Sequence, residues 1–275
     1  MKISTNLIRF NDEFGIKKTI DIYSEAGYEA IDFSAELSEY YTDEHDETFY
    51  RDIKQYALDR GITFDQAHAP IPSSFEDSKA SEKRFFEIVN SMKHAAWLGA
   101  KMIVVHPCHH SSNYGDMMDA TVDLYKRLAP YAKEFGIKIA TENIKYTITE
   151  TIEGFLELID RLDDDVFTVC YDVGHCVVCG VDPIVLTQKL GNRIGCTHIH
   201  DHDGIKDHTI PLLGSIDWDG VMKAFAEVGY EGNLNYEAGR FLDNVPLCLR
   251  ADGAKYMASV ENYLRQRFLY HKNNL

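Results

Sequence analysis

Short apolar runs alternate with longer amphipathic segments along the whole chain. Apolar runs that are bounded by turn residues predict strands, and they lie at Ile3–Asn6, Ala30–Phe33, Thr63–His68, Met102–His106, Lys138–Asn143, Phe167–Asp172, Ile194–His200 and Gly232–Glu237. Between these runs, apolar residues recur at three- and four-residue steps and predict helices, at Ile16–Ala26, Phe49–Arg60, Glu82–Leu98, Met117–Phe135, Thr151–Leu162, Pro183–Leu190, Trp218–Val228 and Leu247–Arg267. The pattern therefore predicts eight successive βα units.

The turn residues support this reading. Glycines that suit a left-handed C-terminal cap stand between a predicted helix and the next strand, at Gly27, Gly61, Gly99, Gly136 and Gly229. Pro130 falls inside the fourth predicted helix and is expected to kink or interrupt it. No linker rich in Gly, Ser or Pro divides the units, and the Gly-rich phosphate loop of dinucleotide folds is missing after the first strand. We therefore predict an α/β protein with one (β/α)₈ barrel domain, residues 1–275.

Composition and charge narrow the possible partners. Hydrophobic residues make up 45% and charged residues 26% of the 275 residues, as in ordinary globular proteins. The formal net charge of −16 disfavours binding to nucleic acid and to anionic membranes. We expect a cytoplasmic protein, because neither a signal peptide nor an apolar run of membrane-spanning length is found. The six scattered cysteines are expected to be reduced thiols.

The predicted strand ends carry the candidate chemistry. Active sites of (β/α)₈ barrels lie at the carboxyl ends of the strands. From the third strand onward, every predicted strand ends at or within one or two residues of a residue type that binds metals: His68, His106, Glu142, Asp172, His200 and Glu237. Converging acids at such a site need a cation, a substrate or basic partners, because carboxylates are rarely buried alone.

The motifs around these residues resemble one family. They are the histidines followed by proline-containing turns at His68 and His106, Glu142, Asp172-Val-Gly-His175, His198-Ile-His200-Asp201 and Glu237. Together they resemble the xylose isomerase-like TIM barrels, which include sugar isomerases and epimerases, inosose and dehydroshikimate dehydratases, and endonuclease IV. The resemblance spans nearly the whole chain and is specific for the superfamily but not for one activity.

For the ketose-epimerase branch, the resemblance implies one divalent metal ion and a set of substrate contacts. The metal ligands would be Glu142, Asp172, His200 and Glu237, with His175 and Lys206 contacting the substrate. Three carboxylates and one imidazole suit Mn²⁺, our first choice, or Mg²⁺, with Co²⁺ and Zn²⁺ as alternatives. Glu142 and Glu237 would exchange a proton beside a carbonyl through a metal-stabilised enediolate, which gives epimerisation or isomerisation. The segment 143–148 lacks a further glutamate of characterised ketose epimerases, which leaves the sugar substrate open.

Three more histidines leave a second branch open. Histidines that match His68, His106 and His208 help to bind a three-zinc cluster in endonuclease IV. Direct substrate contact is an equal alternative for His68 and His106, and substrate contact or an exposed loop position is favoured for His208. A DNA enzyme also needs basic residues that face phosphate. The segment from Ser34 to Thr48 has no Lys or Arg and carries six acids, Glu36, Glu39, Asp43, Glu44, Asp46 and Glu47.

We therefore expect a metal-dependent isomerase or epimerase that acts on a small-molecule sugar or sugar phosphate, without nucleic acid or membrane partners. Lys206 and Arg240 are candidate contacts for a substrate phosphate. A metal-dependent lyase or dehydratase is the second hypothesis, followed by an abasic-site nuclease and a non-catalytic sugar-binding barrel. Retention of all four ligands speaks against the last of these. A homo-oligomeric state is left open.

Overall fold

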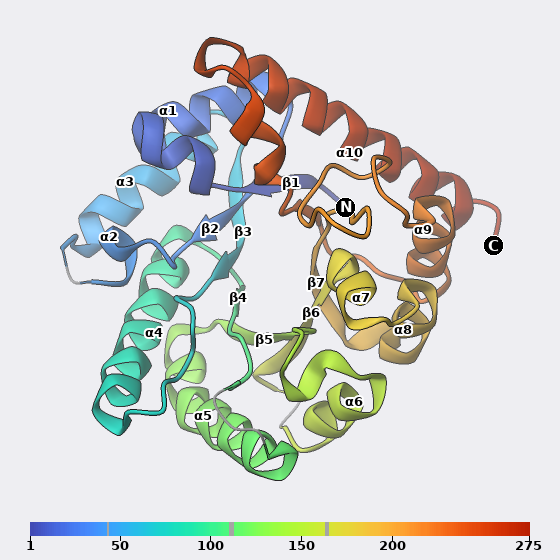
Figure 1. Cartoon of the computed structure of the whole chain (residues 1–275). Coiled ribbons are helices and arrows are strands. Elements are labelled where there is room, and N and C mark those ends of the chain that lie inside the picture. The colour runs from blue at the N-terminus through green and yellow to red at the C-terminus, as the bar shows by residue number, and fades with distance from the viewer. Residues whose placement is uncertain (43, 110–112, 163–164) are drawn as a thin grey trace. The chain divides into compact units, whose positions relative to one another are not determined.

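Eight strands form one sheet in the computed structural model, which describes residues 1–42, 44–109, 113–162 and 165–275 (Figure 1). The strands are β1 (Ile3–Asn6), β2 (Ala30–Ser34), β3 (Thr63–His68), β4 (Met102–Val104), β5 (Lys138–Glu142), β6 (Phe167–Asp172), β7 (Ile194–His198) and β8 (Leu234–Tyr236). Their order is β7-β6-β5-β4-β3-β2-β1-β8, and the resolved pairings are parallel.

The two strands at the ends of this order also meet. The Ile199 amide, directly after β7, donates to the Asn235 carbonyl of β8 at 2.8 Å. The Glu237 amide donates back to the Ile199 carbonyl at 3.2 Å. The sheet therefore closes on itself, and the predicted (β/α)₈ barrel fold is confirmed.

Helices connect the strands. The longer ones are α1 (Ile8–Ala26), α3 (Glu47–Leu58), α4 (Ser78–Leu98), α5 (Tyr114–Phe135), α6 (Ile152–Asp160), α8 (Pro183–Leu190), α9 (Trp218–Glu227) and α10 (Arg250–Lys272). The shorter ones are α2 (Ser38–Tyr41), α7 (Val173–Cys179), and the 3₁₀ turns η1 (Ile148–Glu150), η2 (Gly191–Arg193), η3 (Gly239–Asn244) and η4 (Leu247–Leu249). Within the described ranges, no helix combines the length and the apolar character that crossing a membrane requires.

The sequence pattern located most of these elements closely, although some helix bounds differ by three to five residues and α2 and the 3₁₀ turns were not predicted. The strand bounds agree within two residues, and Gly27, Gly99 and Gly136 adopt the expected left-handed caps. The predicted interruption at Pro130 is wrong, because α5 continues through it; that Pro130 kinks the helix stays a prediction. Pro130 and Lys126 are both exposed, so water can bind the Lys126 carbonyl that loses its helical donor. The other differences are the early start of α1 and the short helix α7.

The chain divides into two compact units. The first unit comprises residues 1–31, 56–63 and 171–275, and its core includes Leu7, Phe10, Ile20 and Phe225. The second unit comprises residues 32–55 and 64–170, and its core includes Phe33, Tyr50, Tyr125 and Phe155. All six cysteines are free thiols, as predicted. That the whole chain is one domain stays a prediction.

Candidate active site

In the first unit, acids and histidines gather at the ends of three strands; we call them the histidine cluster. Asp172 is the last residue of β6, His198 is the last residue of β7, His200 follows two residues later, and Glu237 directly follows β8. The cluster is completed by His175 on α7 and by Asp207 and His208 in the loop after β7.

Asp172 and His200 form the buried centre of this cluster. The Nε2 atom of His200 lies 3.1 Å from each oxygen of the Asp172 carboxylate, and neither side chain is exposed. Burial lowers the pKa of His200, but the Asp172 carboxylate raises it more, so the net shift is upward. Asp172 also begins α7, because its Oδ1 accepts the His175 amide at 2.8 Å. The same residue thus orients both histidines.

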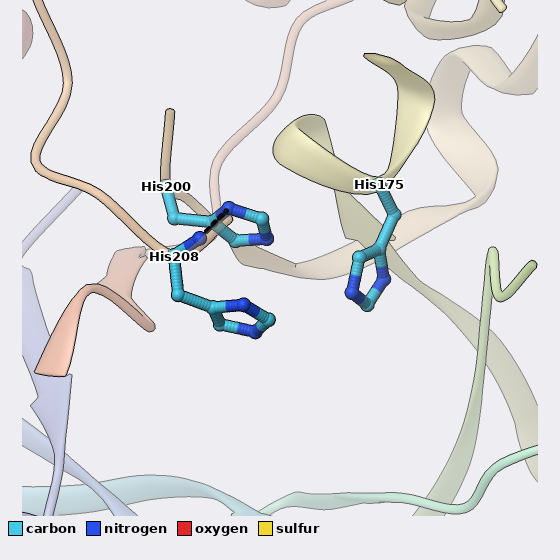
Figure 2. A group of neighbouring side chains, drawn as sticks. All are labelled: His175, His200 and His208. Atoms are coloured by element: carbon cyan, nitrogen blue, oxygen red, sulfur yellow. Dashed lines mark hydrogen bonds between the residues drawn. The ribbon is translucent and has the colours of Figure 1, made fainter. Parts of the chain in front are cut away.

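His208 lies parallel to the His200 ring, with the ring centroids 4.1 Å apart (Figure 2). Its backbone amide donates to His200 Nδ1 at 3.2 Å. A neutral His200 therefore carries its proton on Nε2, toward Asp172. Asp207 lies 3.3 Å from His200 Nδ1 and 3.1 Å from His208 Nδ1. Burial raises the pKa of Asp207, but its hydrogen bond to His208 and the surrounding histidines bring it below the usual range.

Glu237 faces two imidazoles of the cluster. Its Oε2 atom lies 3.2 Å from His198 Nδ1 and 3.9 Å from His208 Nε2. His175 completes the group, since one nitrogen of His175, His200 and His208 each lies within 4.8 Å of the others. Figure 2 shows the His175 ring on the opposite side of this group, carried by α7.

In the second unit, His68, His106 and Glu142 form a smaller group at the ends of β3, β4 and β5. His106 Nε2 lies 3.1 Å from His68 Nε2 and 3.1 Å from Glu142 Oε2. The other ring nitrogen of His68, Nδ1, lies 2.8 Å from the Ala69 carbonyl, so a neutral His68 donates there and presents a lone pair on Nε2. Glu36, from the acidic segment after β2, lies 3.8 Å from His68 Nδ1. Asp43 of that segment lies outside the described residues.

Comparison with known proteins then decides the family. The family model described as a xylose isomerase-like TIM barrel matches residues 20–259. This chain belongs to the xylose isomerase-like TIM barrel family. The predicted resemblance is therefore confirmed.

Individual xylose isomerase-like relatives are distant. An inosose dehydratase of Lacticaseibacillus casei is 28% identical over 210 residues, which cover 63% of this chain and 70% of the relative. A crystal structure of D-psicose 3-epimerase in the presence of D-fructose has a TM-score of 0.80 at 13% identity and covers 96% of this chain and 99% of that one. The IOLI protein with a bound zinc atom has a TM-score of 0.80 at 21% identity, with coverage of 98% and 99%. Both structures share the fold with this chain.

The structure brings together most residues that the strand ends had indicated. Asp172, His175, His200, His208 and Glu237 meet in the first unit, and His68, His106 and Glu142 meet in the second. Lys206 and Arg240 stand apart from these contacts as exposed residues that line a cavity next to Asp207.

Three residues of the site stand in the motifs that carry the family resemblance, but no role was predicted for them. His198 has 1% of its surface exposed and contacts Glu237; its two-residue spacing from His200, which places both on one strand face, was the available signal. Gly174 lies against the His200 ring, where a Cβ atom would collide with it. Asp201 binds the backbone of the loop after β7. The last two contacts depend on tertiary structure, so no local pattern shows them.

The donor atoms of this xylose isomerase-like site fit a divalent metal ion. In the first unit, Asp172, His198 and Glu237 each offer one ligand atom within 4.8 Å of the others. These two carboxylates and one imidazole are ligand types of Mn²⁺ and Zn²⁺ sites. His200, the imidazole expected from the sequence, contacts the same Asp172 carboxylate. The Nδ1 atom of His200 already contacts the Asp207 carboxylate and the His208 amide, the kind of outer partner that orients a metal-binding histidine.

Proposed function

We propose that this chain is a divalent-metal-dependent isomerase or epimerase of a sugar or sugar phosphate. The observation that carries the proposal is the buried pair of Asp172 and His200 at the strand ends of a xylose isomerase-like barrel. The ring stacked on His200, that of His208, faces Glu237. The relationship to D-psicose 3-epimerase and to inosose dehydratase supports a small carbohydrate as the substrate.

The proposed metal ligands are Glu142, Asp172, His200 and Glu237. Mn²⁺ is the first choice for three carboxylates and one imidazole, and Zn²⁺ stays in the set because the IOLI relative binds zinc. When bound, the ion supplies positive charge that stabilises negative charge on the sugar oxygens next to the carbon that loses its proton.

Glu142 and Glu237 are the proposed proton-transfer groups. The imidazoles of His198 and His208 face the Glu237 carboxylate and are proposed to orient it. One carboxylate removes a proton from the carbon beside the carbonyl, and the other returns a proton. Return to the same carbon on its other face gives an epimer, and return to the neighbouring carbon gives an aldose–ketose isomer. His68, His106, His175, Lys206, His208 and Arg240 are proposed to contact the substrate.

The test is incubation with a panel of ketoses and ketose phosphates in deuterated water with Mn²⁺. We expect deuterium-labelled epimers or isomers, detected by NMR. Glu237→Gln should lower turnover by about a hundredfold or more, because it removes a proton acceptor and a charged ligand. The control Glu231→Gln changes an exposed glutamate and should leave turnover unaltered. Equal rates in Glu237→Gln and the wild type would exclude this mechanism.

A lyase is the second candidate, because the inosose dehydratase of L. casei is among the relatives. The same residues would remove the proton next to the carbonyl, after which a β-hydroxyl leaves as water. The same incubation separates the two reactions. An isomerase gives products of unchanged carbon and oxygen content, whereas a dehydratase gives a product lighter by one water.

A further inference from the structure

The first unit contains a cavity beside the histidine cluster, between the loop after β7 and the η3 segment. Its volume is about 730 Å³, within the range of roughly 300–1,000 Å³ that is typical of small-molecule sites. Asp207 lines this cavity and also contacts His200 and His208. A group that binds in the cavity would therefore lie next to a sugar that reacts at the cluster.

Two cations line the cavity, Lys206 and Arg240, and both are exposed. Every other arginine whose side chain the structure describes contacts a carboxylate or has another interaction within the chain. Arg240 has no such partner among the described residues. An unpaired guanidinium offers a planar set of N–H donors that suits a carboxylate or a phosphate.

The acids that line the cavity have partners of their own. The Asp203 carboxylate accepts the backbone amides of Ile205 and Lys206, at 2.8 and 2.6 Å, and these bonds lower its pKa. Asp207 is bound to His208, and Asp243 also interacts within the chain. The oxygens of Asp203 and Asp207 are therefore engaged by partners other than Arg240, whose N–H donors stay available to a ligand.

The rest of the wall is largely apolar. Ile205 has 91% and Leu213 57% of its surface exposed, which is a large exposure for aliphatic side chains. Phe241 and Val245 extend the same wall. Exposed apolar surface of this kind favours an apolar partner.

We propose that this cavity binds an anionic group on an apolar body, a carboxylate or a phosphate carried by an aryl or alkyl substituent of the sugar substrate. Arg240 and Lys206 contact the anion, and Ile205, Leu213 and Phe241 contact the apolar body. The link to a sugar rests on the proposed function, whereas the binding of the anion does not.

Calorimetric titration of the full chain tests the proposal without turnover. The probes are phenyl phosphate and benzoate, with inorganic phosphate and phenol as their separate halves. We expect saturable binding of phenyl phosphate or benzoate, and the tighter of the two identifies the anion. Each separate half should bind at least about tenfold more weakly, because it lacks either the charged hydrogen bonds or the apolar contact.

Arg240→Ala should weaken binding of the tighter probe by about tenfold, and Lys206→Ala is a second, independent variant. Arg51→Ala is the control, since it removes the same charge from an exposed arginine that contacts Glu47 and does not line the cavity. Glu237→Gln should bind the tighter probe as the wild type does, because Glu237 does not line the cavity. A failure of the proposed sugar chemistry is therefore distinguishable from a failure of anion binding. The proposal would be overturned if neither phenyl phosphate nor benzoate bound saturably, or if both cavity variants bound the tighter probe as the wild type does. Inorganic phosphate that binds as tightly as that probe would also overturn it.

Discussion

Gly174 is required at its position by space. It follows the end of β6, and the His200 ring lies where a Cβ atom would project. Its backbone is not left-handed, so conformational freedom is not the reason for a glycine here. In the motif Asp172-Val-Gly-His175, Gly174 thus serves the site as well as Asp172 and His175, because it leaves room for the His200 ring.

Gly174→Ala should displace the His200 ring from Asp172. We expect turnover to fall by tenfold to about a hundredfold, because small displacements of catalytic groups have effects of that size. Steady-state kinetics and the Mn²⁺ dissociation constant measure the change. Gly115→Ala is the control: among the described residues, a Cβ atom at that glycine on α5 would meet only the Asn113 side chain, at 3.4 Å. Wild-type kinetics in Gly174→Ala would disprove the proposed role of the His200 position.

At the scale of elements, one buried carboxylate organises the loop after β7. Asp201 is fully buried, and its oxygens accept the backbone amides of His202, Leu212 and Ile216 and the Trp218 indole N–H, at distances between 2.8 and 3.3 Å. The loop held in this way carries Lys206, Asp207 and His208. Asp201 therefore positions both the histidine cluster and the cavity.

Asp201→Asn should loosen this loop, because an amide NH₂ would face N–H donors. We expect the free energy of unfolding to fall by about 2–4 kcal/mol, the cost of charged hydrogen bonds lost in a buried site, with a parallel loss of turnover. Chemical denaturation measures the change. Asp219→Asn is the control and removes half-exposed charged contacts to Arg267 and His271. It should lower the free energy of unfolding by less than about 1 kcal/mol. Equal effects of the two substitutions would contradict the assigned role of Asp201.

Element bounds were predictable where apolar periodicity decides them. Two differences between the predicted and the observed helices, at α1 and α7, have local causes. The pattern placed the start of α1 at Ile16, whereas the structure continues it back to Ile8 across a kink at Gly15, where φ is 73°. The short helix α7 begins directly at the end of β6, so its seven residues are too few to show a helical period. Strand ends gave the candidate ligands, but the contacts of His198 and Asp201 depend on tertiary structure.

At the scale of the whole molecule, α10 is joined to β1 by a buried acid. Glu261 is fully buried, and its Oε1 accepts the Ser4 amide at 2.8 Å. Its Oε2 has no hydrogen-bond partner among the described residues. Burial raises the pKa of Glu261 well above its usual value, and the Ser4 amide only partly offsets this shift.

This pKa makes stability depend on pH. The folded chain binds the Glu261 proton more tightly than the unfolded chain does. Protonated Glu261 therefore contributes fully to the free energy of unfolding below the unfolded pKa, and this contribution is lost as pH rises through the folded pKa. Glu261→Gln keeps the acceptor for Ser4 and cannot ionise. We expect it to raise the free energy of unfolding by about 1 kcal/mol or more near pH 8, with a smaller gain near pH 5. Denaturation at both pH values measures this, and destabilisation near pH 8 would contradict it.

We propose that the strand-end acids and histidines bind one catalytic divalent metal ion. Metal content per chain tests this most directly, by elemental analysis of protein purified without added metal or chelator. We expect about one Mn²⁺, or another single divalent ion, per chain. We also expect Asp172→Ala to lose most of that ion. A single catalytic ion would be excluded by two or three zinc ions per chain, or by a metal content that Asp172→Ala leaves unchanged.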